Sequence, residues 1–361
     1  HEGLGDVLNW TGQHDEAIVA YQQALLRVPQ QDRIRRSRLH RKCGIIERLQ
    51  YRFQEGQVTY DLAANALGDD PTDPLRDWWR EWVQVQLERM ELLYFARDLA
   101  RLAALVDRVR PDVESWAEPV QRVSFLGRLW SLHFERNRLV VSDEAHGYIE
   151  AAFKACQELD DLGLAAITQF GLGFSHLWRG ELEEAEEHLG QALGLAEQSG
   201  NVVHQMLCLT YLTTVQRKKR QVGPTREYAD RSLAVAQRVG SADYLGMAEA
   251  NLSWAAWRDG DLADTQARAR AAMDHWRRQP RRYPFEWAAL WPLIAVAYSK
   301  DDLPEAMERA RALLDPSQQR PPTVLKGMLE EAIHAWDTGQ AESAREILRQ
   351  AMGPASEMGY L

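Results

Sequence analysis

The sequence predicts an all-α fold, a superhelix of about nine helix hairpins, and two observations support this prediction. Small residues recur at steps of 38 to 44 residues, apart from one step of 85 that covers two repeats. They are Ala17, Gly56, Ala100, Ala185, Thr225, Thr265, Ala306 and Ala344. Apolar residues follow helical spacing within each step, and no segment reads as a strand. A period of about 20 to 50 residues means that each unit buries its apolar face by stacking on its neighbours.

The first hairpin shows the internal pattern most completely. A first helix, a glycine turn, a second helix and a terminating proline are marked in order by Leu4, Gly5, Leu8, Gly12, Ala17, Tyr21, Ala24 and Pro29. We expect Gly5 and Ala24 to let two helix backbones approach closely, and Tyr21 to fill the groove between successive hairpins.

The same pattern returns along the chain and predicts a single solenoid domain over residues 1–361. Residues 1–67 hold two repeats, residues 76–160 two degenerate repeats, and residues 162–361 five more. Val140 and Val141 are poor helix formers, so a turn is expected there, with Ser142 or Asp143 capping the helix that follows. The proline-containing stretches 68–74 and 315–322 are interpreted as loops between repeats.

The order of large apolar residue, small residue, glycine turn, alanine, aromatic residue and alanine resembles the tetratricopeptide (TPR) repeat. The best copy is FGLGFSHLWRGELEEAEEHLGQALGLAEQSG at 170–200. Further segments, among them WWREWVQVQLERMELLY and YPFEWAALWPLIAVA, look like the C-terminal helical-repeat region of bacterial multidomain signalling ATPases. In those proteins a nucleotide-cyclase, kinase or DNA-binding module is joined to a STAND or AAA-like ATPase. The TPR-like pattern implies a right-handed superhelix, and the resemblance to these proteins implies a sensor or scaffold arm. This chain has no GxxxxGK[ST] loop, so no nucleotide chemistry carries over to it.

Composition and motifs argue against several classes of function. The net charge of −10 gives the whole chain no bias toward nucleic acid or anionic membrane. The ten histidines form no metal-binding motif, and six of them, at 40, 133, 146, 204, 275 and 334, are dispersed along the repeats. No membrane span, cofactor site or catalytic constellation is expected. Three scattered cysteines suit buried thiols in a reducing compartment, so a cytoplasmic protein is expected.

The chain begins at His1 with its first helix already under way. We therefore expect a fragment of a longer protein, with a preceding element that covers this helix.

The candidate partner-binding surface is an aromatic track with cations along the first helices of pairs five to eight. Its members are Phe170, Phe174, Trp178, Arg217, Lys218, Trp254, Trp257, Arg258, Trp291 and Tyr298. Two alternatives stay open for the rings, which either bind a partner or pack between adjacent first helices. Arg217 and Lys218 either suit a helix C-terminus or clamp a carboxylate of an acidic peptide. A second basic cluster, residues 33–42, either faces solvent or meets an acidic surface or nucleic acid.

We therefore expect a non-catalytic protein–protein interaction solenoid, the regulatory arm of a larger signalling ATPase. Its partner would be a protein, a peptide or the ATPase module of the same chain, and self-association is a further alternative. The other classes considered are a nucleic-acid-binding repeat, a small-ligand sensor in the superhelix interior and an enzyme.

Overall fold

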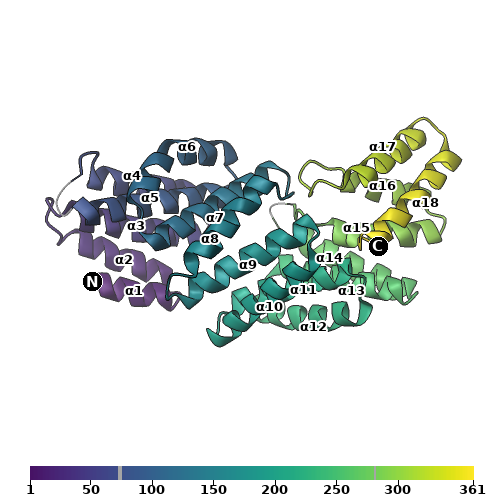
Figure 1. Cartoon of the computed structure of the whole chain (residues 1–361), viewed down its shortest axis with the longest axis horizontal. Coiled ribbons are helices and arrows are strands. Elements are labelled where there is room, and N and C mark those ends of the chain that lie inside the picture. The colour runs from purple at the N-terminus through teal and green to yellow at the C-terminus, as the bar shows by residue number, and fades with distance from the viewer. Residues whose placement is uncertain (72–74, 280–281) are drawn as a thin grey trace. The chain divides into compact units, whose positions relative to one another are not determined.

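A computed structural model describes residues 1–71, 75–279 and 282–361 of the chain. The described residues form eighteen α-helices and contain no strand, which confirms the predicted all-α class (Figure 1). The predicted loop at 315–322 contains no helix. Of the predicted loop at 68–74, residues 68–71 are non-helical and the rest lies outside the described residues.

The helices belong to two compact units. The first unit comprises residues 1–136 and 150–159, and the second comprises residues 137–149 and 160–361. The helices of the first unit are α1 (Glu2–Trp10), α2 (His14–Leu25), α3 (Arg33–Leu49), α4 (Phe53–Leu67), α5 (Leu75–Phe95), α6 (Leu99–Trp116) and α7 (Pro119–Arg136). The helix α8 (Asp143–Cys156) contributes its first half to the second unit and its second half to the first.

The second unit holds the five C-terminal hairpins. Its helices are α9 (Leu162–Arg179), α10 (Leu182–Gln198), α11 (Val202–Lys218), α12 (Val222–Val239), α13 (Ala242–Arg258), α14 (Leu262–Arg277), α15 (Trp287–Ser299), α16 (Leu303–Leu313), α17 (Thr323–Asp337) and α18 (Ala341–Glu357). Each odd-numbered helix of this unit packs on the even-numbered helix that follows it, as α9 does on α10 and α13 on α14.

Close approach within hairpins explains two of the small residues. A side-chain Cβ at Gly5 would lie 2.4 Å from the ring of Tyr21, and one at Gly44 would lie 2.7 Å from the ring of Tyr60. Each tyrosine therefore rests against the backbone of the preceding helix. Tyr21 also belongs to a core cluster with Leu39 of the next hairpin, so it joins two hairpins as expected.

Polar turn residues fix where helices begin. The side chains of Asp161 and Asp302 accept hydrogen bonds from the backbone N–H three residues later, and Ser142 does the same at the start of α8. Such caps satisfy donors that the first helical turn leaves open. The predicted turn before α8 and its Ser142 cap are therefore present.

The three cysteines are the buried thiols that the sequence led us to expect. Cys43, Cys156 and Cys208 are buried and free. Burial raises the pKa of the Cys43 and Cys208 thiols to about 12. Among the helices that the structure describes, none combines the length and the apolar character that a membrane span requires.

Candidate functional site

The candidate residues lie on the first helices of consecutive pairs in the second unit. Phe170, Phe174 and Trp178 are on α9, Arg217 and Lys218 end α11, Trp254, Trp257 and Arg258 are on α13, and Trp291 and Tyr298 are on α15. The helix α9 contacts α11, α11 contacts α13, and α13 contacts α15. We call these four helices the first-helix layer of the second unit.

Burial divides the aromatic track. Phe174 is 6% exposed, Trp291 2% and Trp254 0%, so these three rings pack in the interior and offer no surface to a partner. The half-buried members are Phe170, Trp178, Trp257 and Tyr298, and Arg258 is exposed. The physical reason is packing between neighbouring helices: Phe174 lies against the ring of Tyr211 of α11, and every residue of α15 from Trp287 to Ala297 is buried.

Rings from outside the candidate set complete a cluster around α9. The ring of Phe174 meets that of Tyr211 edge to face, with centroids 4.5 Å apart. Trp178 stacks on Phe285 at 5.1 Å and meets Trp287 edge to face at 6.3 Å. Such offset and edge-to-face pairs are favourable beyond the area they bury. The cluster joins α9 to α11 and to the segment that leads into α15.

Arg217 is fully buried, and oxygens of the chain itself occupy its donors. Its Nε donates to the backbone oxygen of Gly359 at 3.0 Å, and its other nitrogens donate to those of Tyr360 at 2.5 Å and Ala288 at 2.9 Å. Burial lowers the pKa of its guanidinium to about 9. Arg217 therefore clamps the segment Gly359–Leu361 onto the first-helix layer instead of presenting an open charge to a carboxylate.

Lys218 lies among aromatic rings. Its Nζ is 4.3 Å from the ring centroid of Tyr360, 5.5 Å from that of Trp287 and 5.7 Å from that of Trp178. No described carboxylate lies within ion-pair distance of this Nζ. Burial, reinforced by the neighbouring Arg217, lowers the pKa of the Lys218 ammonium to about 7. Cation–π attraction offsets only part of the desolvation of an ammonium group. We call Lys218 and these three rings the lysine cage.

The segment Gly359–Leu361 closes the lysine cage. Gly359 has a φ of +71°, and a Cβ there would lie 2.5 Å from the Cα of Lys218. Tyr360 is 9% exposed and Leu361 3%. Sequence reasoning missed this segment, because its only local signal is a glycine after a helix, which is typical of an ordinary C-terminal turn.

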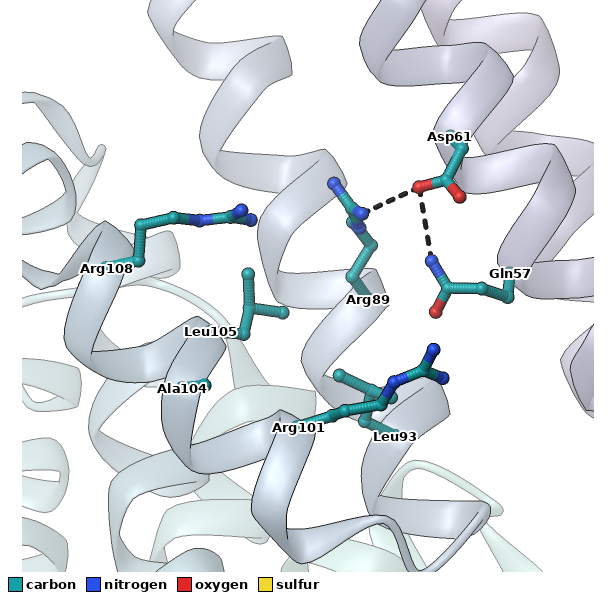
Figure 2. Close-up of a pocket in the computed structure, with 8 residues that line it drawn as sticks. All are labelled: Gln57, Asp61, Arg89, Leu93, Arg101, Ala104, Leu105 and Arg108. Atoms are coloured by element: carbon teal, nitrogen blue, oxygen red, sulfur yellow. Dashed lines mark hydrogen bonds and ion pairs between the residues drawn. The ribbon is translucent and has the colours of Figure 1, made fainter.

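A second charged feature lies in the first unit. An open cavity of about 450 Å³ is lined by residues of α4, α5 and α6, with Arg89, Arg101 and Arg108 facing it (Figure 2). Asp61, the one carboxylate of its lining, binds Arg89 at 2.6 Å. The lining therefore carries excess positive charge and can hold an anion. Periodicity gave no sign of it, since the three arginines come from two different helices.

The basic cluster at 33–42 is largely paired within the first unit. Arg41 and Arg38 lie 2.7 Å and 3.6 Å from carboxylate oxygens of Glu81, and Lys42 lies 2.7 Å from one of Asp6. These carboxylates neutralise much of the positive charge that would otherwise be available to an acidic surface or to nucleic acid.

Histidines meet in the second unit, where the sequence suggested only dispersed ones. The ring centroids of His146 and His176 are 4.8 Å apart, and those of His176 and His188 are 5.4 Å apart. His146 comes from α8 and His176 from α9, so spacing along the chain does not reveal the cluster.

No protein-family model matches the chain, and no curated protein matches its sequence significantly. Solved structures do resemble it. The Rap protein complexed with competence and sporulation factor is 11% identical, with a TM-score of 0.64 over 91% of each chain. NprR in complex with its cognate peptide NprX is 12% identical, with a TM-score of 0.62 over 85% of this chain and 86% of that one.

A third similar structure is a signal transduction ATPase with numerous domains (STAND) with a tetratricopeptide repeat sensor, from Pyrococcus horikoshii. It is 16% identical, with a TM-score of 0.56 over 86% of this chain. This chain spans only 45% of the length of that protein. At these identities the likeness concerns the fold, and it confirms the predicted TPR-like superhelix of helix hairpins.

Proposed function

We propose that this chain is a non-catalytic protein-interaction solenoid and that the first-helix layer of its second unit binds an acidic peptide segment at the lysine cage. One observation carries the proposal. Lys218 is a cation held among three aromatic rings without a carboxylate partner among the described residues. The half-buried ring of Trp178 beside it offers apolar contact area to a peptide.

The electrostatics of the cage favour an anionic ligand. The lowered pKa of Lys218 reports that its charged form lacks the stabilisation that water gives an exposed ammonium. A carboxylate supplied by a partner would restore that stabilisation in a region of low dielectric. A hydrogen bond between charged groups contributes about 1.5–3 kcal/mol, or roughly ten- to a hundredfold in affinity.

The proposal extends to a regulatory role. The sequence resembles the helical-repeat arm of bacterial signalling ATPases, and the fold is shared with a STAND protein that carries a repeat sensor. The Rap protein and NprR, whose folds are similar, are seen with a factor and with a cognate peptide. We infer that this chain serves a larger signalling protein as its sensor arm, with a peptide, a protein or the ATPase module as its partner.

The test is selection of random peptides displayed on phage against the full chain. We expect the enriched peptides to carry aspartate or glutamate and to bind Lys218→Met at least about tenfold more weakly than the parent. Lys300→Met is the matched control, because Lys300 caps the C-terminus of α15 in the same unit but is exposed.

Two results would contradict the proposal. One is an enriched peptide set without carboxylates. The other is an acidic peptide that binds folded Lys218→Met as tightly as it binds the parent and Lys300→Met. Circular dichroism at 222 nm checks that the variants remain folded.

A further inference from the structure

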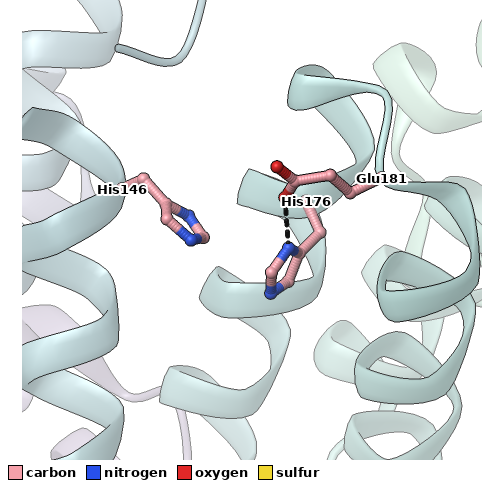
Figure 3. Close-up of side chains that lie close together, drawn as sticks. All are labelled: His146, His176 and Glu181. Atoms are coloured by element: carbon pink, nitrogen blue, oxygen red, sulfur yellow. Dashed lines mark hydrogen bonds and ion pairs between the residues drawn. The ribbon is translucent and has the colours of Figure 1, made fainter. Parts of the chain in front are cut away.

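Three side chains that can ligate a metal converge near the start of the second unit. His146 belongs to the first half of α8, His176 to the last turn of α9, and Glu181 to the turn between α9 and α10 (Figure 3). One ligand atom from each residue can be chosen so that all three lie within 4.8 Å of one another. The three side chains are half-buried, so a small ion can reach them and part of its ligand shell can be excluded from water.

The chemical types of these ligands suit a first-row transition metal. Imidazole nitrogen and carboxylate oxygen bind Zn²⁺ at about 2.0–2.2 Å, and a three-ligand site leaves a fourth position for water or substrate. Ligand atoms of a tetrahedral Zn²⁺ site lie about 3.3 Å apart, as these bond lengths require. To bind Zn²⁺, the three ligand atoms must therefore approach from within 4.8 Å of one another to about 3.3 Å. Side-chain movements of about 1 Å achieve this without a change in the helices.

Neighbouring groups already orient the ligands. The Nδ1 of His146 shares a hydrogen bond with the hydroxyl of buried Ser175 at 2.9 Å. The Nδ1 of His176 and Oε2 of Glu181 share another at 2.6 Å. The Nε of Arg179 donates to Oε1 of Glu181 at 2.9 Å, and its guanidinium also pairs with Asp143 at 2.7 Å. The bonds from Ser175 and Arg179 come from outside the ligand set, and such outer hydrogen bonds fix the orientation of the ligands in metal sites.

We propose that His146, His176 and Glu181 form a binding site for a divalent transition metal of the Zn²⁺ class. The ion takes the place of the hydrogen between Nδ1 of His176 and Glu181, and the neutral imidazole of His176 then carries its ring proton on Nε2. Zn²⁺ then links α8 to the turn between α9 and α10, and Ser175 and Arg179 hold the ligands from outside. This proposal is independent of the peptide site, which uses other residues.

The experiment is calorimetric titration of the untagged, metal-free full chain with ZnCl₂, with Co²⁺ absorption as a second readout of tetrahedral coordination. We expect one ion per chain and a visible Co²⁺ spectrum. Glu181→Gln keeps the size of the side chain but removes its charge. This variant and His176→Ala should each weaken Zn²⁺ binding by at least about tenfold. Ser175→Ala should weaken it by about tenfold through loss of orientation.

His334→Ala is the matched control, since His334 is an exposed histidine of α17 in the same unit and should leave binding unchanged. Two results would overturn the site. Either the folded parent takes up no Zn²⁺ at micromolar concentrations, or the double variant His146→Ala/His176→Ala binds Zn²⁺ as tightly as the parent. Helix content measured by circular dichroism shows whether each variant is folded.

Discussion

Replacing Gly359 by alanine should release the segment that closes the lysine cage. The backbone of Gly359 has a φ of +71°, a left-handed conformation that costs an alanine about 1–2 kcal/mol. The new methyl group would also lie 2.5 Å from the Cα of Lys218 and 2.7 Å from the backbone oxygen of Arg217. Both are backbone atoms of the last turn of α11, which cannot give way as a flexible side chain could. The segment must therefore move.

Movement of the segment also removes its hydrogen bonds from Arg217. The oxygens of Gly359 and Tyr360 accept from the guanidinium at 3.0 Å and 2.5 Å, and a bond to a charged donor contributes about 1.5–3 kcal/mol. Even with partial adjustment, the free energy of local opening should fall by at least about 2 kcal/mol. This corresponds to roughly thirtyfold faster amide exchange.

Hydrogen exchange followed by mass spectrometry or NMR measures this directly. The amides of Tyr360 and Leu361 donate to the backbone oxygen of Ala355 at 2.8 Å and 3.1 Å, so they report whether the segment is docked. Gly339→Ala is the control: its φ is +77°, but a Cβ there meets nothing within 4 Å. If Gly359→Ala and Gly339→Ala raise the rate of amide exchange equally, each at its own turn, then neither the steric clash nor the hydrogen bonds from Arg217 hold the segment in place.

Two further predictions concern stability. The pKa of Lys218 is about 7 in the fold against an ordinary 10.5, so between these pH values the unfolded chain binds a proton that the folded chain does not. Stability measured by urea unfolding should therefore rise with pH over this window relative to Lys218→Met; parallel curves would contradict the lowered pKa of Lys218. Gly44→Ala places a methyl group 2.7 Å from the ring of buried Tyr60 and should destabilise the first unit by about 1–3 kcal/mol. Gly127→Ala, in a helix with open space around it, should be neutral or stabilising in thermal unfolding, and equal effects would refute the close-approach argument.

The repeat architecture was predictable because it depends on local spacing. Recurring small residues, helical periodicity and turn residues such as Gly12 and Ser142 act within about 40 residues, and each hairpin is built from such neighbours. The burial of Trp254 and Trp291 was harder to predict from the sequence. A stripe of aromatic residues looks the same in sequence whether it faces a groove or a neighbouring helix. One signal was present: WAALWPLIAVA is apolar on every side, which is typical of a buried helix.

Contacts between distant segments were not predictable. Arg217 and Gly359 are 142 residues apart, and nothing in either local pattern points to the other. His146 and His176 come from successive hairpins, and Glu181 from the turn after them. Periodicity tells which residues share a face of one helix, whereas these groups depend on how hairpins stack. The groups that contact Lys218 and Arg217 could therefore be identified only from the three-dimensional structure.

Proton uptake on binding is the most direct test of the proposed peptide site. An acidic peptide from the selection would be titrated calorimetrically into the full chain at pH 8, in buffers of different ionisation enthalpy. With a pKa of about 7, the Lys218 amine is mostly neutral at this pH and should gain a proton when a carboxylate binds beside it. The account predicts uptake approaching one proton for the parent and none for Lys218→Met. Binding without proton uptake, or equal uptake by both, would contradict it.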